Sequence, residues 1–164
     1  EGLARSVADS GGVVIVPALS GLGAPHWRPE ARGLISGLSF ASGRAHIARA
    51  ALEAMAQQTH DLGEAFAADG ARWTRLRIDG GMSVNDWMAQ DLADILDLPV
   101  ERPRFVETTA LGAGMLAAVG AGLFGSLQEA AGAMRGPVGE FHPAMTAEIR
   151  AGRLALWRDA LGAV

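Results

Sequence analysis

LRIDGGMSVNDWMAQ, the stretch Leu76–Gln90, holds the sharpest change of pattern in the sequence: an apolar run ends at two glycines and a helical pattern follows. The run predicts a strand that ends at Asp79-Gly80-Gly81, a turn that no Cβ obstructs. Ser83 stands where a cap for the following helix is expected. A junction of this kind can bring backbone N–H groups up to a phosphate or a nucleoside. Two glycines after a strand are also typical of an ordinary tight turn.

The segments on either side of this stretch predict a parallel pair of strands. Trp73–Ile78 and the proline-flanked Pro99–Pro103 are the expected strands, and Ser83–Leu96 is the amphipathic helix between them. A strand, helix and strand in this order form a right-handed crossover, and ligands bind at the carboxyl ends of such strands. Asp79-Gly80-Gly81 falls at that end, which makes a nucleotide site as good an interpretation as a plain turn.

The first part of the chain predicts an antiparallel pair of strands and a long helix. Val13–Val16 and Arg32–Phe40 are the expected strands, and the loop between them is rich in glycine and proline. We expect Trp27 to anchor that loop by burial. Ser42 is the candidate N-cap of a helix that spans about Arg44–Ala68.

Three helices are expected after the parallel pair. The first begins near Glu107, with a threonine in the capping position and small residues that allow close packing, so we expect it to lie on the sheet or against its neighbour. A capping-box pattern starts a short helix over Ser126–Met134. Thr146–Ala163 is the expected closing helix. No strand is predicted between the last two helices.

Composition limits the classes of function. The 164 residues carry 14 basic and 18 acidic side chains, a formal charge of −4, without a run of like charges, so we expect no nucleic-acid partner. The absence of cysteine excludes disulfides and thiolate metal sites, and the four histidines lack ligand spacing. No apolar run approaches the roughly 20 residues that span a bilayer, so we expect no membrane partner and a cytoplasmic protein. Because the chain opens at Glu1 within a helical pattern, we expect it to be a piece of a longer polypeptide.

Several motifs together resemble one family. The spacing D-G-G-x-x-x-N-x-x-x-x-Q in Asp79–Gln90 is followed by A-D-I-L in Ala93–Leu96, P-V-E-R-P in Pro99–Pro103 and E-T-T-A-L-G-A in Glu107–Ala113. In this order they resemble the C-terminal half of the FGGY carbohydrate kinases. The loop Pro17–Gly33, PALSGLGAPHWRPEARG, is more similar to the branch that phosphorylates glycerol than to the xylulose kinases.

The resemblance implies a fold, a reaction and three site residues. The fold would be α/β, an actin-like (ribonuclease H-like) ATPase domain, with residues 1–164 forming the C-terminal nucleotide-binding portion and an incomplete sheet. Such kinases transfer the γ-phosphoryl group of Mg-ATP to a terminal hydroxyl of a polyol. The resemblance places the backbone of Gly81 near the ribose and phosphates and Asn85, one turn into the helix, against the adenine. Gly80 is included because a side chain there would crowd the same approach.

The same resemblance places the catalytic base and the polyol-binding residues upstream of Glu1. No residue of this chain is therefore assigned a catalytic or metal-binding role, and the chain alone is predicted to be inactive. Asp79 could act as a general base, but an aspartate before two glycines is as often a turn-bonding residue, so we interpret it as structural or as a water-mediated magnesium contact.

Two other functions stay open: a kinase of another sugar or polyol such as xylulose, and a non-catalytic actin-like nucleotide-binding module. Sheet edges left exposed by missing strands favour pairing between copies, so we expect a homo-oligomer.

Overall fold

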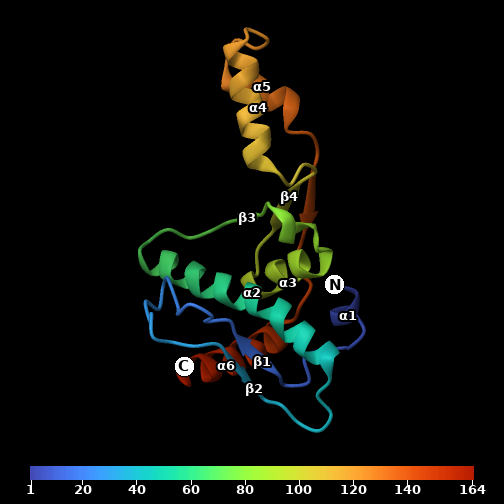
Figure 1. The fold of residues 1–164 in the computed structure, drawn as a ribbon, viewed down its shortest axis with the longest axis vertical. Helices are drawn as coiled ribbons and strands as arrows, with labels where there is room; N and C mark the ends of the chain where they lie inside the picture. The colour runs from blue at the N-terminus through green and yellow to red at the C-terminus, as the bar shows by residue number, and fades with distance from the viewer.

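A long helix, α2 (Arg44–Ala68), crosses the body of the molecule between two small sheets (Figure 1). The computed structural model describes all 164 residues. One sheet pairs β1 (Val14–Val16) antiparallel with β2 (Leu34–Ser36), as the sequence predicts. The other sheet has the order β3 (Leu76–Arg77), β4 (Val100–Pro103), β5 (Val138–Phe141).

The predicted parallel crossover is confirmed. β3 and β4 are parallel, with Leu76 opposite Val100, and the connection between them contains a 3₁₀ turn, η1 (Gly81–Val84), and the helix α3 (Asp86–Leu96). β5 runs antiparallel to β4 and was not predicted. Its sequence Val-Gly-Glu-Phe is largely exposed and contains a glycine, so it lacks the apolar alternation that identifies a half-buried strand.

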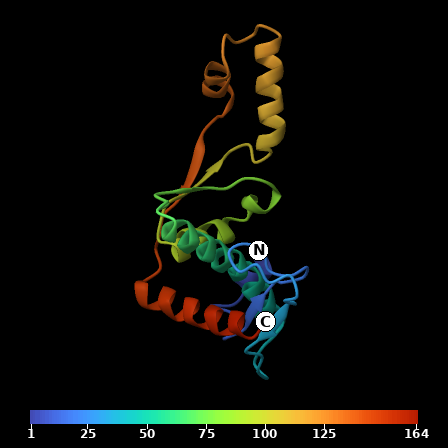
Figure 2. The same ribbon diagram turned by 90° about the vertical axis from the view of Figure 1, so that its left-hand side faces the viewer.

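Two helices form an arm that extends away from the rest of the molecule (Figures 1 and 2). α4 (Thr108–Gly120) packs against α5 (Leu127–Met134), and Met115 is the only residue of α4 that is buried. Of the two predicted placements for α4, packing against its neighbour is therefore correct and packing on the sheet is wrong. The predicted threonine cap is also wrong, because the residue in the N-cap position is Glu107 and its side chain makes no capping hydrogen bond.

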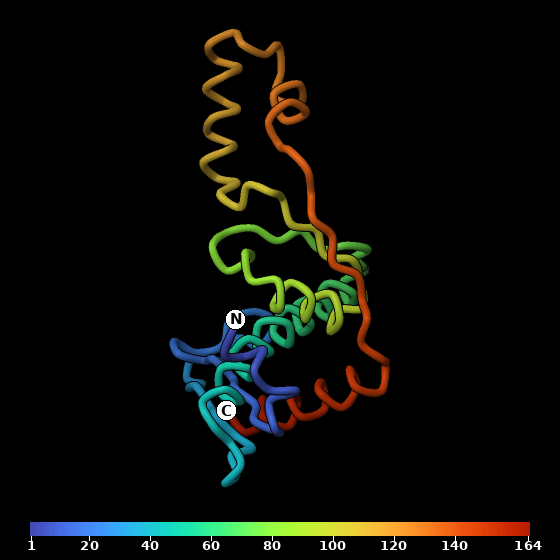
Figure 3. Tube along the Cα trace, turned by 90° about the vertical axis from the view of Figure 1, so that its right-hand side faces the viewer, coloured from blue at the N-terminus to red at the C-terminus, as the bar shows by residue number.

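The body contains two apolar cores on opposite sides of α2. The first lies between the β1–β2 pair, α2 and the closing helix α6 (Ala147–Gly162), and Trp157 at its centre is 0% exposed. The second lies between α2, α3 and β4 (Figure 3). The first core consists of Val14, Val16, Ala18, Leu22, Ala31, Ala54, Trp157, Ala160 and Leu161, and the second of Ala56, Met88, Leu92, Ala93, Ile95 and Val100.

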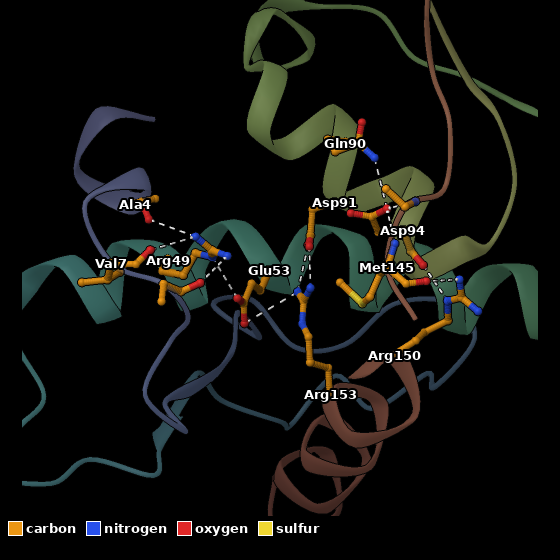
Figure 4. Close-up of polar contacts among 12 residues, drawn as sticks. Ala4, Val7, Arg49, Glu53, Gln90, Asp91, Asp94, Met145, Arg150 and Arg153 are labelled. Atoms are coloured by element: carbon orange, nitrogen blue, oxygen red, sulfur yellow. Dashed lines mark hydrogen bonds and ion pairs between the residues drawn. The ribbon is translucent and has the colours of Figure 1, made fainter. Parts of the chain in front are cut away.

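A network of buried charges joins α2, α3 and α6 to the short helix α1 (Gly2–Arg5) and the segment that follows it (Figure 4). The Arg153 guanidinium donates to both oxygens of Asp91, at 2.5 and 2.9 Å, and lies 3.7 Å from Glu53. Arg49 donates to Glu53 at 3.1 Å and to the carbonyls of Ala4, Val7 and Ala8. Burial raises the pKa of both carboxyl groups, Glu53 and Asp91, above their usual values, and the arginines only partly offset it.

Polar contacts, not Trp27, anchor the long loop between β1 and β2. Trp27 is 74% exposed, so the prediction that it anchors the loop by burial is wrong. Its neighbours hold the loop instead: His26 Nε2 lies 2.9 Å from Asp61 Oδ2, and the Arg28 guanidinium donates to the carbonyls of Val164 at 2.6 Å and Leu161 at 3.0 Å. The Leu161 carbonyl lies in the last turn of α6, where a helix has no internal donor for it, and Val164 follows the helix.

Alanine substitutions at two adjacent positions of this loop should therefore differ in their effect on the free energy of unfolding. We expect Trp27→Ala to change the free energy of unfolding by no more than about 0.5 kcal/mol. Arg28→Ala should lower it by about 1–3 kcal/mol, because two charged hydrogen bonds are lost. Urea denaturation measures both, and a larger loss for Trp27→Ala than for Arg28→Ala would contradict this assignment of the anchors.

Candidate functional site

The turn after β3 is fixed by its own backbone. Gly80 has a φ of +78°, which residues with a side chain rarely adopt, and its N–H donates to the carbonyl of Val106 at 2.8 Å. The Gly80 carbonyl accepts from both the N–H of Ser83, at 3.0 Å, and the Ser83 hydroxyl, at 2.7 Å. Ser83 is 2% exposed and closes the turn, so the prediction that it caps the following helix is wrong.

Asn85 is the cap of α3. Its Oδ1 accepts from the N–H of Met88 at 3.0 Å, so Asn85 lies at the start of the helix and not one turn into it as predicted. The side chain is half-buried, and no atom of the chain accepts a hydrogen bond from its Nδ2. Asn85 therefore uses its oxygen for the fold, and its Nδ2 donors have no acceptor within the chain.

Gly81 presents an open face. A Cβ built on Gly81 would have no neighbour within 4 Å, and its φ lies outside the left-handed region. The N–H groups of Gly81 and Met82 donate to no acceptor in the chain. Gly80 also has free space around it, but its positive φ alone requires glycine. The prediction explains the glycine at position 80 by the space that a ligand needs. The structure adds a second reason, the positive φ of its backbone.

A cleft of about 460 Å³ lies beside the turn, between the ends of the strands and the arm. Asp79, Arg77, Thr108, Met115 and Arg135 are among its lining residues, whereas Gly80, Gly81 and Asn85 are not. The Thr108 hydroxyl donates to Asp79 and so ties the start of α4 to the end of β3. Because the Asp79 carboxylate already accepts this hydrogen bond within the fold, the contact supports a structural interpretation of Asp79.

Two arginines hold the strands that carry the turn. Arg75 and Arg77 both donate to Glu101 on β4, and the hydrogen bond from Arg77 lowers the pKa of the Glu101 carboxyl. A third arginine, Arg102, donates to the carbonyl of Ser83 at 2.7 Å. Arg102 is not among the predicted site residues, because an arginine in a short proline-flanked strand gives no sign of what it contacts.

The arrangement is suited to binding a ligand through hydrogen bonds. The N–H groups of Gly81 and Met82 and the Nδ2 of Asn85 supply donors on one short turn, and phosphate and ribose oxygens or adenine nitrogens are their natural acceptors. No group of three or more His, Cys, Asp or Glu side chains is placed to hold a metal ion.

The α/β fold, with a glycine turn at the end of a parallel strand followed by a helix, agrees with the predicted actin-like ATPase class. Within that class the chain belongs to the FGGY family of carbohydrate kinases: the sequence model of the family's C-terminal domain matches residues 2–121. The predicted family resemblance is thus confirmed.

Relatives and solved structures agree with this assignment. The chain is 55% identical over 161 residues to a glycerol kinase of Rhodospirillum centenum, covering 98% of this chain and 32% of that protein. It is 50% identical over 165 residues to a glycerol kinase of Alcanivorax borkumensis, covering 100% of this chain and 33% of that protein. The chain therefore spans about a third of the length of these relatives.

Among solved structures, the Plasmodium falciparum glycerol kinase with ADP matches with a TM-score of 0.84 and 34% identity, over 98% of this chain and 32% of that one. A xylulose kinase of Lactobacillus acidophilus matches with a TM-score of 0.75 at 23% identity, over 98% of this chain and 32% of that one, and supports the fold alone. None of the helices is both long and apolar enough to cross a membrane.

Proposed function

We propose that this chain forms one wall of the ATP site in a kinase that phosphorylates a small polyol, glycerol to glycerol 3-phosphate. Residues 1–164 would act as the C-terminal nucleotide-binding domain of that kinase. The observation that carries the proposal is the open face of Gly81, with its unpartnered N–H groups, next to the free Nδ2 of Asn85. The relatives named glycerol kinase, at 50–55% identity, favour glycerol over xylulose as the acceptor.

In this proposal the chain contributes to binding and positioning. Phosphoryl transfer depends mainly on alignment and on stabilisation of charge, so a wall that fixes the nucleotide acts on the reaction without touching the acceptor hydroxyl. Gly81 would approach the phosphates and ribose, and Asn85 would donate to the nucleoside. The base and the polyol-binding groups would come from the rest of such a kinase, and the chain alone would remain inactive.

Magnesium would enter with the nucleotide. Mg²⁺ commonly keeps several waters and is held by one or two carboxylates together with substrate phosphates, and it would neutralise charge on those phosphates. Asp79 directly precedes the turn in the sequence and already accepts a hydrogen bond from Thr108, and its contact with such an ion would be through water. A cytoplasmic location and association between copies complete the proposal.

Substitutions at Asn85 can separate its two roles. Serine also caps helices well, so Asn85→Ser should leave the free energy of unfolding within about 0.5 kcal/mol of the wild type. The same change removes the amide donor and should weaken ADP binding about tenfold, the loss of one hydrogen bond. Asn85→Ala should weaken binding and also lower the free energy of unfolding by about 1 kcal/mol. Calorimetric titration with ADP and urea denaturation give the two quantities, and unchanged ADP affinity in both variants would refute the role of Asn85.

A chimera tests the proposed function in an active enzyme. The matching third of the Rhodospirillum centenum glycerol kinase would be replaced by this chain, and we expect glycerol-dependent release of ADP from ATP. The 164-residue chain alone is expected to release none. A folded chimera without activity, or turnover by the isolated chain, would contradict the proposal.

A further inference from the structure

Arg102 contacts the end of the turn after β3 and the start of the helix that follows it. From β4, its NH1 donates to the carbonyl of Ser83 at 2.7 Å, and its NH2 lies 2.7 Å from Oδ1 of Asp86, the first residue of α3. The side chain is only 22% exposed, and its guanidinium lies 5.1 Å from the centroid of the Phe141 ring on β5. Arg102 is therefore itself held in place by the sheet.

These contacts lie on either side of Asn85. Ser83 closes the turn onto Gly80, and Asp86 follows the cap directly, so one guanidinium spans Asn85 and holds the end of the turn whose start carries the N–H groups of Gly81 and Met82. An arginine fork suits this task, because its donors have a fixed relative geometry that a lysine cannot reproduce. The bond to the Ser83 carbonyl is the more important of the two, since Asp86 is 59% exposed and exposed ion pairs contribute little.

We propose that Arg102 is a positioning residue for the nucleotide: it holds the backbone of the Gly80–Asn85 turn in its binding geometry without contacting the ligand. The inference rests on the proposed function, because it assumes that the nucleotide binds at this turn. It predicts that the turn, which its own hydrogen bonds close, becomes less ordered in the free chain when Arg102 is removed. A turn that must be ordered at the moment of binding binds more weakly.

Arg102→Met tests the inference, because methionine keeps an unbranched apolar stem next to Phe141 and removes both polar contacts. Amide hydrogen exchange in the free chain should become about tenfold faster at Ser83 and Asn85, whose N–H groups close the turn. The Kd for ADP should rise about tenfold, and Arg102→Lys should recover part of both effects. Arg104→Met is the matched control, because Arg104 is exposed, follows the same strand and makes no side-chain contact with the turn; we expect it to leave both quantities unchanged.

The outcomes distinguish a failure of this inference from a failure of the proposed function. Wild-type exchange rates at Ser83 and Asn85 in Arg102→Met would overturn the inference, whatever happens to ADP. So would a lower urea midpoint with an unchanged Kd for ADP, which would mark Arg102 as a stabilising residue only. Failure of the wild-type chain to bind ADP would instead overturn the proposed function. If Arg102→Met does not fold, the same comparison is made between Arg102→Lys and Arg104→Met.

Discussion

Arg153→Met is expected to lower the free energy of unfolding by about 3–5 kcal/mol, the cost of leaving a buried charge unpaired. Arg153 is the only partner of Asp91, which is 3% exposed, and it also lies near Glu53 (Figure 4). Without it, two carboxyl groups face each other in a buried site with Arg49 as the remaining cation.

The double variant Arg153→Met/Asp91→Leu is the control for this prediction. Removing both members of a buried ion pair is often nearly neutral, because no uncompensated charge remains. We therefore expect the double variant to recover most of the stability that the single variant loses in urea denaturation. Equal losses in the single and double variants would show that Arg153 acts through packing and not through its charge.

The loss in Arg153→Met should also depend on pH. Burial raises the pKa of Glu53 and of Asp91 in the folded chain, so protonation of these groups favours folding over unfolding. The two carboxyl groups therefore lower the free energy of unfolding increasingly as the pH rises through their folded pKa values. Removal of Arg153 raises these pKa values further. The difference in unfolding free energy between wild type and Arg153→Met should thus shrink as the pH falls from about 7 toward the unfolded pKa values near 4.

Gly81→Val is expected to weaken ADP binding at least about 100-fold, which corresponds to the loss of roughly two hydrogen bonds to charged phosphate groups. The side chain would occupy the open face of Gly81, between the unpartnered N–H groups and the nucleotide. Because Gly81 has no neighbour within 4 Å of a built Cβ and no left-handed φ, the fold itself should tolerate valine. Calorimetry with ADP measures the effect, and Gly81→Ala should fall between wild type and Gly81→Val.

Gly80→Ala, at the adjacent residue, is expected to affect stability where Gly81→Val affects ADP affinity. Its φ of +78° makes any side chain strained, so this variant should lose about 1–3 kcal/mol of unfolding free energy. Gly81→Val should lose affinity and Gly80→Ala should lose stability. A Gly81→Val chain that binds ADP as tightly as wild type would mean that the nucleotide does not approach this face.

Several elements of the fold follow from local signals. The β-branched run in β1 and the capping serine of α5 act within a few residues, and the structure contains these elements as predicted. The helices α2 and α6 also lie where they were predicted, but the N-cap of α2 is Gly43, so the prediction of Ser42 as that cap is wrong. The parallel pairing of β3 and β4 follows from element order alone. In the same way, the family motifs are local, so the sequence could identify Gly80, Gly81 and Asn85 as candidates.

What could not be predicted depends on contacts between distant segments. The cap of α3 is Asn85 and not Ser83, because the buried Ser83 hydroxyl bonds back to Gly80 and a 3₁₀ turn delays the helix. Trp27 is exposed, and the loop is held by Arg28, whose acceptors lie far along the chain, in α6 and at Val164. Arg102 could not be recognised for the same reason: its partners lie 16 to 39 residues away.

Chemical-shift mapping of the ¹⁵N-labelled 164-residue chain with ADP is the most direct test of the proposed site. We expect the largest changes at the backbone amides of Gly81 and Met82 and at the side-chain amide of Asn85, with saturation as ADP is added. Changes centred instead on Thr108 and Arg135, in the cleft beside the turn, or no saturable change at all, would contradict the proposal that the nucleotide binds at the Gly80–Asn85 turn.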